Sequence, residues 1–156
     1  MAVMSKVPFR VDPRQQSRYR IVMSLRPPGA APVPFIAVHV PAPVGGGAGP
    51  WSANLDQLGV LASAAGPAVV LAGDFNADSG HAPFRRVASR GRVRDAQDAG
   101  GGGFRPTWSE VTRSPPLLRL DHVMVGSGSG VAGFDFLPPV GSDHRGVVAR
   151  LQLRRS

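Results

Sequence analysis

The 156-residue sequence contains no cysteine, a single lysine, a single glutamate and few aromatic residues. The lack of cysteine excludes a disulfide framework and thiolate chemistry. No apolar run approaches the roughly 20 residues that a membrane-spanning helix needs, and the first residues lack the apolar core of a signal peptide. As written, the sequence therefore predicts a soluble chain in the cytoplasm. Its length fits one domain with a buried core.

The formal charge of +8 comes from arginine, because Lys6 is the only lysine. Guanidinium groups match the oxygens of phosphate esters, so phosphate-bearing partners such as nucleic acid suit this charge balance. A coding sequence biased toward Ala, Gly, Pro and Arg gives the same charge with no partner at all. Both interpretations of the charge stay open at this point.

The first part of the sequence predicts two strands followed by a helix. Residues 18–25 alternate polar and apolar side chains and residues 35–40 form an apolar run, which indicates a hairpin with a long loop. A Gly/Pro-rich loop follows over residues 41–50. Apolar residues then recur at helical spacing from Trp51 to Ala65, which predicts a helix of about 14 residues with one face on the sheet.

The most informative segment is Val69–Asp78, an apolar run that ends in a carboxylate and an amide. The run predicts a buried strand of a parallel or mixed sheet, and with the preceding strand and helix it forms a βαβ unit with a right-handed crossover. Asp74 and Asn76 lie two residues apart, so they point the same way at the carboxyl end of this strand, where open α/β sheets place their chemistry. Taken alone, such a pair is more often a strand followed by an Asx turn.

The remaining sequence predicts one more helix and several short strands. Residues 82–90 form an amphipathic pattern that Gly91 is expected to end as a C-cap. Residues 118–125 predict a strand that Asp121 and His122 interrupt, and a carboxylate there is costly to bury unless it is paired. The other expected elements are a flexible loop, a linker-like loop, a short strand and an alternating strand at residues 95–103, 126–130, 134–136 and 147–153.

Acidic, amide and imidazole side chains occur at four places that are strand ends or lie inside apolar strands. These side chains are His39, Asp74 with Asn76, Asp121, and Asp143 with His144. Oxygen ligands and imidazole without any thiol are what a hard divalent cation and a phosphate ester require. Phosphodiester hydrolysis needs an oriented water, neutralised charge on the non-bridging oxygens and a stabilised leaving oxygen, and these residue types can supply all three.

Four short motifs contain these residues, in the order Val38-His39, Gly73-Asp74-Phe75-Asn76, Leu120-Asp121-His122-Val123 and Ser142-Asp143-His144-Arg145. Together with Thr107-Trp108 they resemble the endonuclease/exonuclease/phosphatase superfamily, which has the fold of pancreatic deoxyribonuclease. The resemblance covers roughly residues 18–153, but only the second part of the family's domain. It implies an α/β fold, specifically a partial four-layer α/β sandwich that consists of a mixed sheet with flanking helices.

The resemblance also implies an activity, that of a phosphoesterase that depends on Mg²⁺ or Mn²⁺. The residue matching Asp74 orients or deprotonates the attacking water in the family, and the residue matching Asn76 binds the phosphate. Asp143 is expected to bind the metal ion, with Asp74 and Asn76 as further ligands.

The resemblance also implies that two histidines, His144 and His39, contact the phosphate. The residue matching His144 contacts the scissile phosphate in the family, and the residue matching Asp121 pairs with it, which fixes its tautomer and favours imidazolium. His39 matches a histidine that hydrogen-bonds the phosphate. A histidine partner also accounts for a buried charge at Asp121.

The sequence departs from the family at the metal site. The first part of the family's domain supplies an asparagine and a glutamate that is the principal metal ligand, whereas the only glutamate here is Glu110 and the only asparagines are Asn54 and Asn76. We therefore expect residues 18–156 to form a domain that lacks the family's N-terminal part, after a poorly ordered segment over residues 1–17. The chain is then the C-terminal portion of a longer reading frame, with one sheet face poorly covered.

Two functional hypotheses follow. The first is a phosphoesterase that is weak or inactive as this chain alone, and that is completed by an N-terminal segment or by self-association through the uncovered sheet face. The alternative is a non-catalytic remnant that binds phosphate esters or nucleic acid through arginine. Nucleic acid, inositol phosphate and phospholipid all remain open as substrates, because the loops at residues 41–50 and 95–103 carry little information.

Overall fold

The computed structural model describes residues 1–109 and 117–155, so Glu110 lies outside the described residues. The strands are β1 (Phe9–Val11), β2 (Arg20–Leu25), β3 (Val33–His39), β4 (Val70–Asp74), β5 (Val93–Asp95), β6 (Asp121–Gly126), β7 (Gly130–Leu137) and β8 (Gly146–Gln152). The helices are α1 (Ala48–Ala65), α2 (Ala82–Gly91) and α3 (Ala96–Ala99). In the described part of the chain, no helix combines the length and the apolar character needed to cross a membrane.

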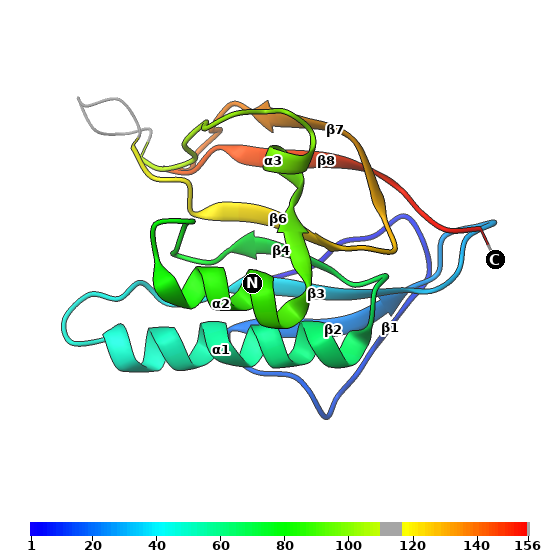
Figure 1. Cartoon of the computed structure of the whole chain (residues 1–156), viewed down its shortest axis with the longest axis horizontal. Coiled ribbons are helices and arrows are strands. Elements are labelled where there is room, and N and C mark those ends of the chain that lie inside the picture. The colour runs from blue at the N-terminus through cyan, green and yellow to red at the C-terminus, as the bar shows by residue number, and fades with distance from the viewer. Residues whose placement is uncertain (110–116, 156) are drawn as a thin grey trace.

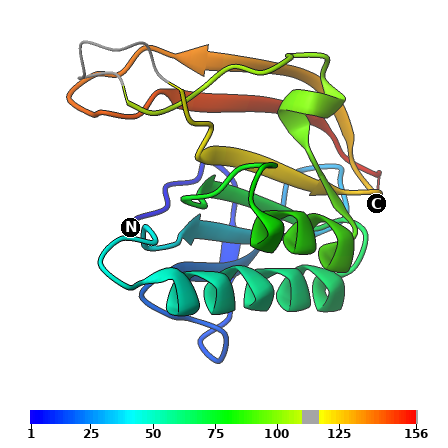
Figure 2. The same ribbon diagram turned by 60° about the vertical axis from the view of Figure 1, so that its left-hand side comes forward.

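The strands form a six-stranded sheet in the order β1-β2-β3-β4-β6-β5 and a separate two-stranded sheet, β7-β8 (Figure 1). β2 and β3 form the expected hairpin, and β3 and β4 are parallel neighbours joined through α1. The other pairs of the main sheet are antiparallel, so the sheet is mixed. Helices α1 and α2 cover one face of the main sheet and β7-β8 lie against the other (Figure 2). The fold is therefore α/β, a mixed sheet with flanking helices.

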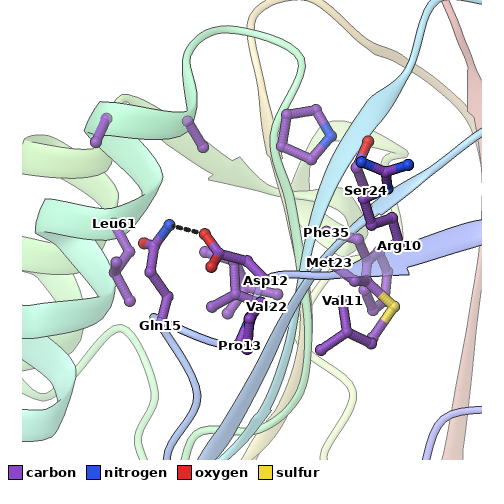
Figure 3. Close-up of a pocket in the computed structure, with 14 residues that line it drawn as sticks. Arg10, Val11, Asp12, Pro13, Gln15, Val22, Met23, Ser24, Phe35 and Leu61 are labelled. Carbon is purple, nitrogen blue, oxygen red and sulfur yellow. Dashed lines mark hydrogen bonds between the residues drawn. The ribbon is translucent and has the colours of Figure 1, made fainter.

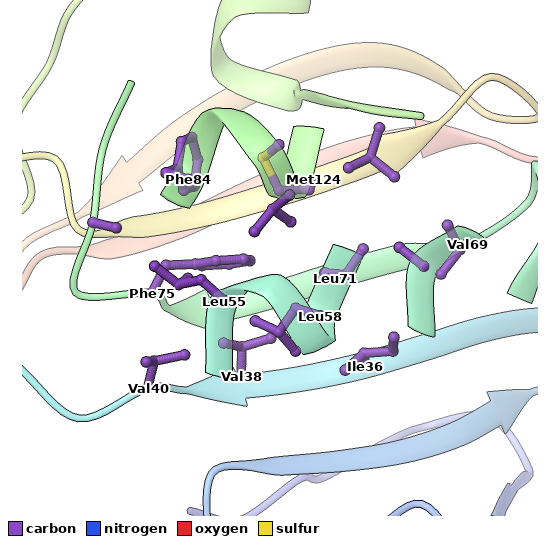
Figure 4. Close-up of a cluster of buried hydrophobic side chains, with 14 of the residues drawn as sticks. Ile36, Val38, Val40, Leu55, Leu58, Val69, Leu71, Phe75, Phe84 and Met124 are labelled. Atoms are coloured by element: carbon purple, nitrogen blue, oxygen red, sulfur yellow. The ribbon is translucent and has the colours of Figure 1, made fainter. Parts of the chain in front are cut away.

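The core between the main sheet and the helices follows from the period of the strands. Ile36, Val38 and Leu71 face α1, because alternate residues of a strand point to the same side. They pack on Leu55 and Leu58, which are 0% and 2% exposed (Figure 4). Burial of each such leucine contributes about 1.5–3 kcal/mol. Trp51 also belongs to this core, as its helical spacing predicts.

The opposite face of the main sheet packs on the second sheet. Val70, Val123 and Val125 form a buried cluster here. Half-buried side chains of β7 and β8 pack against it, namely Val131, Phe134, Val147, Ala149 and Leu151. A cavity of about 160 Å³ lies at the margin of this interface, between Phe35 on β3 and Leu151 on β8. Two strands thus cover the middle of this face, and the apolar packing ends near β2.

Three elements, β1, β5 and α3, lie where the sequence predicts none. β1 lies within residues 1–17 and pairs with β2, although all three of its residues are exposed. The expected loop at 95–103 instead begins with the end of β5 and helix α3. Asp95 Oδ1 accepts a hydrogen bond from the backbone of Gln97 at 2.9 Å, so an N-cap starts a helix in a glycine-rich segment.

Several element boundaries also differ from the prediction. α1 begins at Ala48 inside the Gly/Pro-rich segment. Gly91 is the last residue of α2 and not its cap, because Arg92 takes the left-handed conformation with φ 51°. A Cβ at Gly91 would lie 2.8 Å from Cβ of Ala62, so glycine here permits the close approach of the two helices. Asp121 is the first residue of β6 and does not interrupt it, since the strand does not extend back to residue 118.

Gly73→Ala is expected to destabilise the fold by about 3 kcal/mol or more. Gly73 has φ 137°, and a Cβ at this position would lie 2.0 Å from the carbonyl oxygen of Val38 on the neighbouring strand. Urea unfolding measures the loss. Gly49→Ala is the control, because Gly49 lies in the first turn of α1 with nothing within 4 Å of its added Cβ. Equal stability of the two variants contradicts the tight β3–β4 contact.

Candidate active site

Three polar residues lie at the same end of three neighbouring strands. His39 and Asp74 are the last residues of β3 and β4, and Asp121 is the first residue of β6. His39 pairs with Asp74 across β3 and β4, and Asp74 pairs with Asp121 across β4 and β6. Directly paired residues place their side chains on the same face of a sheet. His39 Nε2 lies 3.9 Å from Asp74 Oδ2, with the imidazole largely exposed and the carboxylate mostly buried. The sheet register therefore forms a row of polar groups on the face that carries the second sheet.

The turn after β4 fixes the carboxylate of Asp74. Asn76 donates to both of its oxygens, from the backbone N–H to Oδ1 at 2.7 Å and from Nδ2 to Oδ2 at 2.9 Å. Asn76 takes a left-handed conformation with φ 46°. Its Nδ2 also donates to the carbonyl oxygen of Val40, and its own carbonyl oxygen accepts from Trp51 Nε1 at 3.0 Å. The buried helix residue Trp51 thus supports the turn that positions Asp74.

The segment before β8 brings two further predicted residues to this row. His144 Nδ1 lies 2.7 Å from Asp121 Oδ2, so the expected pair of imidazole and carboxylate is present. Asp143 Oδ2 accepts a hydrogen bond from Trp108 Nε1 at 2.9 Å. Thr107 Oγ1 accepts from the backbone N–H of Asp121 at 3.1 Å, which fixes the start of β6.

One open pocket of about 460 Å³ collects most of the predicted site residues. Five of them line it, namely His39, Asp74, Asp121, Asp143 and His144, together with Val38 and the first two residues of the chain. Asn76 contributes to this site through Asp74 and does not line the pocket. The structure therefore brings all six predicted residues to one end of the main sheet.

The environment of the pocket shifts the pKa of three groups. Burial raises the pKa of Asp74, partly offset by the hydrogen bond from Asn76, and the nearby charge of Asp121 raises it further. Burial alone lowers the pKa of His144, but the hydrogen bond and charge of Asp121 outweigh burial and raise it above 6.5. The hydrogen bond from Trp108 lowers the pKa of Asp143. Asp74 is thus made more basic, and the cationic form of His144 is more favoured than in a free imidazole.

The same residues do not assemble a complete metal site. Among residues 1–109 and 117–155, no group of three or more His, Asp or Glu side chains could hold a metal ion. Both oxygens of Asp74 accept hydrogen bonds from Asn76, and Asp143 Oδ2 accepts one from Trp108. Within the described residues, a divalent cation therefore lacks the number of carboxylate ligands that hard cations prefer in proteins.

A second cavity, of about 470 Å³, lies at the edge formed by β1 and β2 (Figure 3). It includes Asp12, which accepts a hydrogen bond from Gln15, and the apolar residues Val22, Phe35 and Leu61. No predicted site residue lines this cavity. Of these two cavities, only the pocket at the strand ends is lined by predicted site residues.

The sequence interpretation missed a group of buried polar side chains behind the candidate site. His122 is fully buried, with Nδ1 2.5 Å from Asp95 Oδ2, and Arg119 is 3% exposed. Arg119 and Asp98 form a two-point ion pair at 2.7 and 3.1 Å. The sequence contains one signal for this group. Arg119 and His122 are polar residues that flank Leu120-Asp121, next to a strongly apolar run.

Asp121→Asn is expected to lower the pKa of His144, because the burial that opposes the imidazolium remains while the paired charge is lost. An NMR titration of the imidazole measures it. The raised pKa also adds stability, present in full below pH 6.5 and lost as the pH rises through the folded pKa. Asp56→Asn is the control, since Asp56 pairs with Arg86 on the helix side. A His144 pKa that is the same in Asp121→Asn as in the control contradicts the pairing.

Several proteins of known structure share the fold of this chain. The chain aligns with a mannosyl-6-phosphatase of Bacteroides thetaiotaomicron (19% identity, TM-score 0.64) over 86% of its own length and 57% of that protein's. It aligns with a humanized D. rerio TDP2 (15%, TM-score 0.70) over 94% and 66%, and with the endonuclease domain of the telomere-specific retrotransposon TRAS1 (18%, TM-score 0.68) over 96% and 68%. At these identities the likeness shows the fold alone.

The chain covers only part of several of these proteins, 56% of a functionally unknown conserved protein from Enterococcus faecalis among them. No curated protein is a significant match in sequence. The profile of the Endonuclease/Exonuclease/phosphatase family matches residues 1–144, a range that includes all six predicted site residues and ends at His144. The chain belongs to the Endonuclease/Exonuclease/phosphatase family.

Proposed function

We propose that this chain hydrolyses phosphoester bonds at the pocket that His39, Asp74, Asp121, Asp143 and His144 line. The observation that supports this most is the alignment of His39, Asp74 and Asp121 in one row, with His144 hydrogen-bonded to Asp121. Members of this family are hydrolases of phosphoester bonds, and a phosphatase and an endonuclease are among the structural neighbours. The proposal assigns the same class of reaction to this site.

Asp74 is the group that accepts a proton from the attacking water. Its raised pKa makes the carboxylate a better base than an exposed aspartate. The two hydrogen bonds from Asn76 occupy one lone pair on each oxygen and fix the plane of the carboxylate, while a second lone pair on each oxygen is left. The oxygen of the water forms the new bond to phosphorus, and its proton passes to Asp74.

His144 acts on the other side of the phosphate. Asp121 occupies Nδ1, so Nε2 is the nitrogen that can donate to a substrate. The imidazolium stabilises negative charge that develops on the phosphate oxygens, and Nε2 can give its proton to the leaving oxygen as the bond from phosphorus breaks. His39, exposed beside Asp74, is placed to donate to a non-bridging oxygen.

The family's enzymes are generally dependent on divalent metal ions, and Mg²⁺ or Mn²⁺ is the cation that we propose for this chain. A bound cation supplies positive charge for the phosphate and lowers the pKa of a bound water. The described residues do not complete a site for it. The steps above therefore use only the side chains that line the pocket.

The substrate is proposed as a phosphate ester, either a diester or a monoester, with nucleic acid, inositol phosphate and phospholipid as candidates. The alternative is phosphate binding by arginine without catalysis, for which three of the 17 arginines are less available. Arg86, Arg119 and Arg150 each form an ion pair with an aspartate of this chain. Binding of nucleic acid through arginine alone also predicts a steep loss of affinity with salt and no cleavage.

Asp74→Asn and His144→Ala are each expected to lower the turnover of bis-(p-nitrophenyl) phosphate by about 100-fold or more, the usual effect of removing a positioned base or electrostatic group. Absorbance of released p-nitrophenol, with and without Mg²⁺ or Mn²⁺, measures the rate. Asp135→Asn serves as the control because Asp135 is exposed on β7 and pairs with Arg150. If both site variants turn over substrate as fast as the control, this pocket is not the site of hydrolysis.

Mn²⁺ is expected to bind the 156-residue chain weakly, with a Kd above about 10⁻⁴ M, because affinity for a hard cation depends on the number and charge of its ligands. Titration calorimetry of the wild type measures the affinity, and Asp74→Asn identifies any heat that comes from the pocket. Micromolar binding that Asp74→Asn abolishes contradicts the incomplete ligand set of the described residues.

A further inference from the structure

The side chain of His122 connects two segments that carry the candidate site. Its Nε2 lies 2.8 Å from the carbonyl oxygen of Ala77 and 2.9 Å from that of Arg119. Ala77 directly follows Asn76, and Arg119 lies two residues before Asp121. One buried imidazole thus binds both the turn that positions Asp74 and the chain that leads into Asp121.

The ring does this from the opposite face of the sheet. His122 follows Asp121 in β6, and successive residues of a strand point to opposite faces. The imidazole lies among side chains of the helix side, with its centroid 4.4 Å from that of Phe84 and 5.5 Å from that of Phe75. His122 is 0% exposed and therefore cannot touch a substrate in the pocket.

A buried set of charges orients this ring. Asp95 Oδ2 lies 2.5 Å from His122 Nδ1 and 3.5 Å from the nearest guanidinium nitrogen of Arg119. Arg119 pairs in turn with Asp98, whose side chain is exposed, so the buried members of the set are His122, Asp95 and Arg119. The removal of one member of a buried charged set is costly because it leaves the others unpaired. The set therefore fixes the rotamer of His122, and with it the direction in which Nε2 donates.

We propose that His122, oriented by Asp95, is a positioning residue that holds the Asp74–Asn76 turn and Asp121 in register for catalysis. The inference rests on the proposed hydrolytic function for its effect on rate, but the geometry it describes can be measured without turnover. Two carbonyl oxygens 42 residues apart in sequence (77 and 119) meet at one donor. Loss of that donor leaves both carbonyls without this partner and frees the turn to move relative to β6.

The competing explanation is that His122 is an ordinary core residue that only fills space between Phe75 and Phe84. His122→Phe separates the two roles, because phenylalanine keeps an aromatic ring in the same space but has no N–H group. His122→Gln is the matched rescue, since its amide nitrogen can donate near the position of Nε2. Val87→Ala is the stability control. Val87 is a fully buried core residue on α2, and its side chain has no polar atom that could hydrogen-bond to a site residue.

The experiment compares the three variants at matched fractions of folded protein. In His122→Phe we expect amide NMR shifts to change at Asn76, Ala77 and Asp121, and kcat for bis-(p-nitrophenyl) phosphate to fall about 10-fold or more with KM little changed. We expect His122→Gln to recover part of both effects. Val87→Ala should lower stability without either effect.

Each outcome decides between the two explanations. If His122→Phe leaves these amide shifts and kcat as Val87→Ala does, His122 only packs the core and the inference is wrong. A second outcome is that His122→Phe changes the shifts and His122→Gln restores them, but neither the wild type nor any variant hydrolyses the substrate. In that case the positioning role stands and the proposed hydrolytic function fails. Should His122→Phe not fold, Asp95→Ala tests the orientation of the ring, because it removes the acceptor for Nδ1 that fixes the direction of Nε2. Amide shifts at Asn76 and Ala77 and a kcat that match those of Val87→Ala then contradict the inference.

Discussion

The arrangement of the candidate site depends on the register between β3, β4 and β6. The three strands pair so that His39, Asp74 and Asp121 stand side by side, and a shift by one residue would turn each side chain to the other face. Gly73 is part of this constraint, because its φ of 137° and its contact with the Val38 carbonyl exclude any larger residue without a backbone shift. The strand end is therefore fixed by backbone contacts before any polar side chain contributes.

Apolar packing on both faces of the sheet supports this register. Phe75, between Asp74 and Asn76, is fully buried on the helix side against Phe84, whereas Asp74 faces the pocket. Val123 and Val70 pack on the second sheet, two and four residues inside the polar row respectively. The polar groups thus lie where the apolar contact between the two sheets ends, and His144 reaches Asp121 from the segment just before β8. The side chains of the candidate site and the core share the same strands, which limits how far the site can move.

Sequence could predict the features whose signals are local. The run into Asp74, the helix from Trp51 to Ala65 and the two strands of the first hairpin all follow from apolar periodicity, and the family motifs placed Asp121 next to His144. It could not predict β1, whose three exposed residues carry no pattern, or the buried role of His122. The partners of that ring come from Asp95, Ala77 and Arg119, and no periodicity relates residues at such distances. The sequence also predicted the wrong role for Gly91. Glycine is needed there because Ala62 of the neighbouring helix leaves no room for a Cβ, and the cap of α2 is Arg92.

The electrostatics of the pocket explain why imidazole groups matter in a site with few metal ligands. Asp74 and Asp121 are direct neighbours on adjacent strands, and the charge of Asp121 helps to raise the pKa of Asp74. His144 and His39 both lower the pKa of Asp74, so positive imidazole groups offset part of this repulsion. A divalent cation in the same pocket would reduce the same repulsion, and would therefore oppose the raised pKa of His144 that Asp121 and Asp74 sustain. The described residues give His144 a close carboxylate partner, and the hydrogen bond and charge of that partner are what raise the pKa of the imidazole despite its burial.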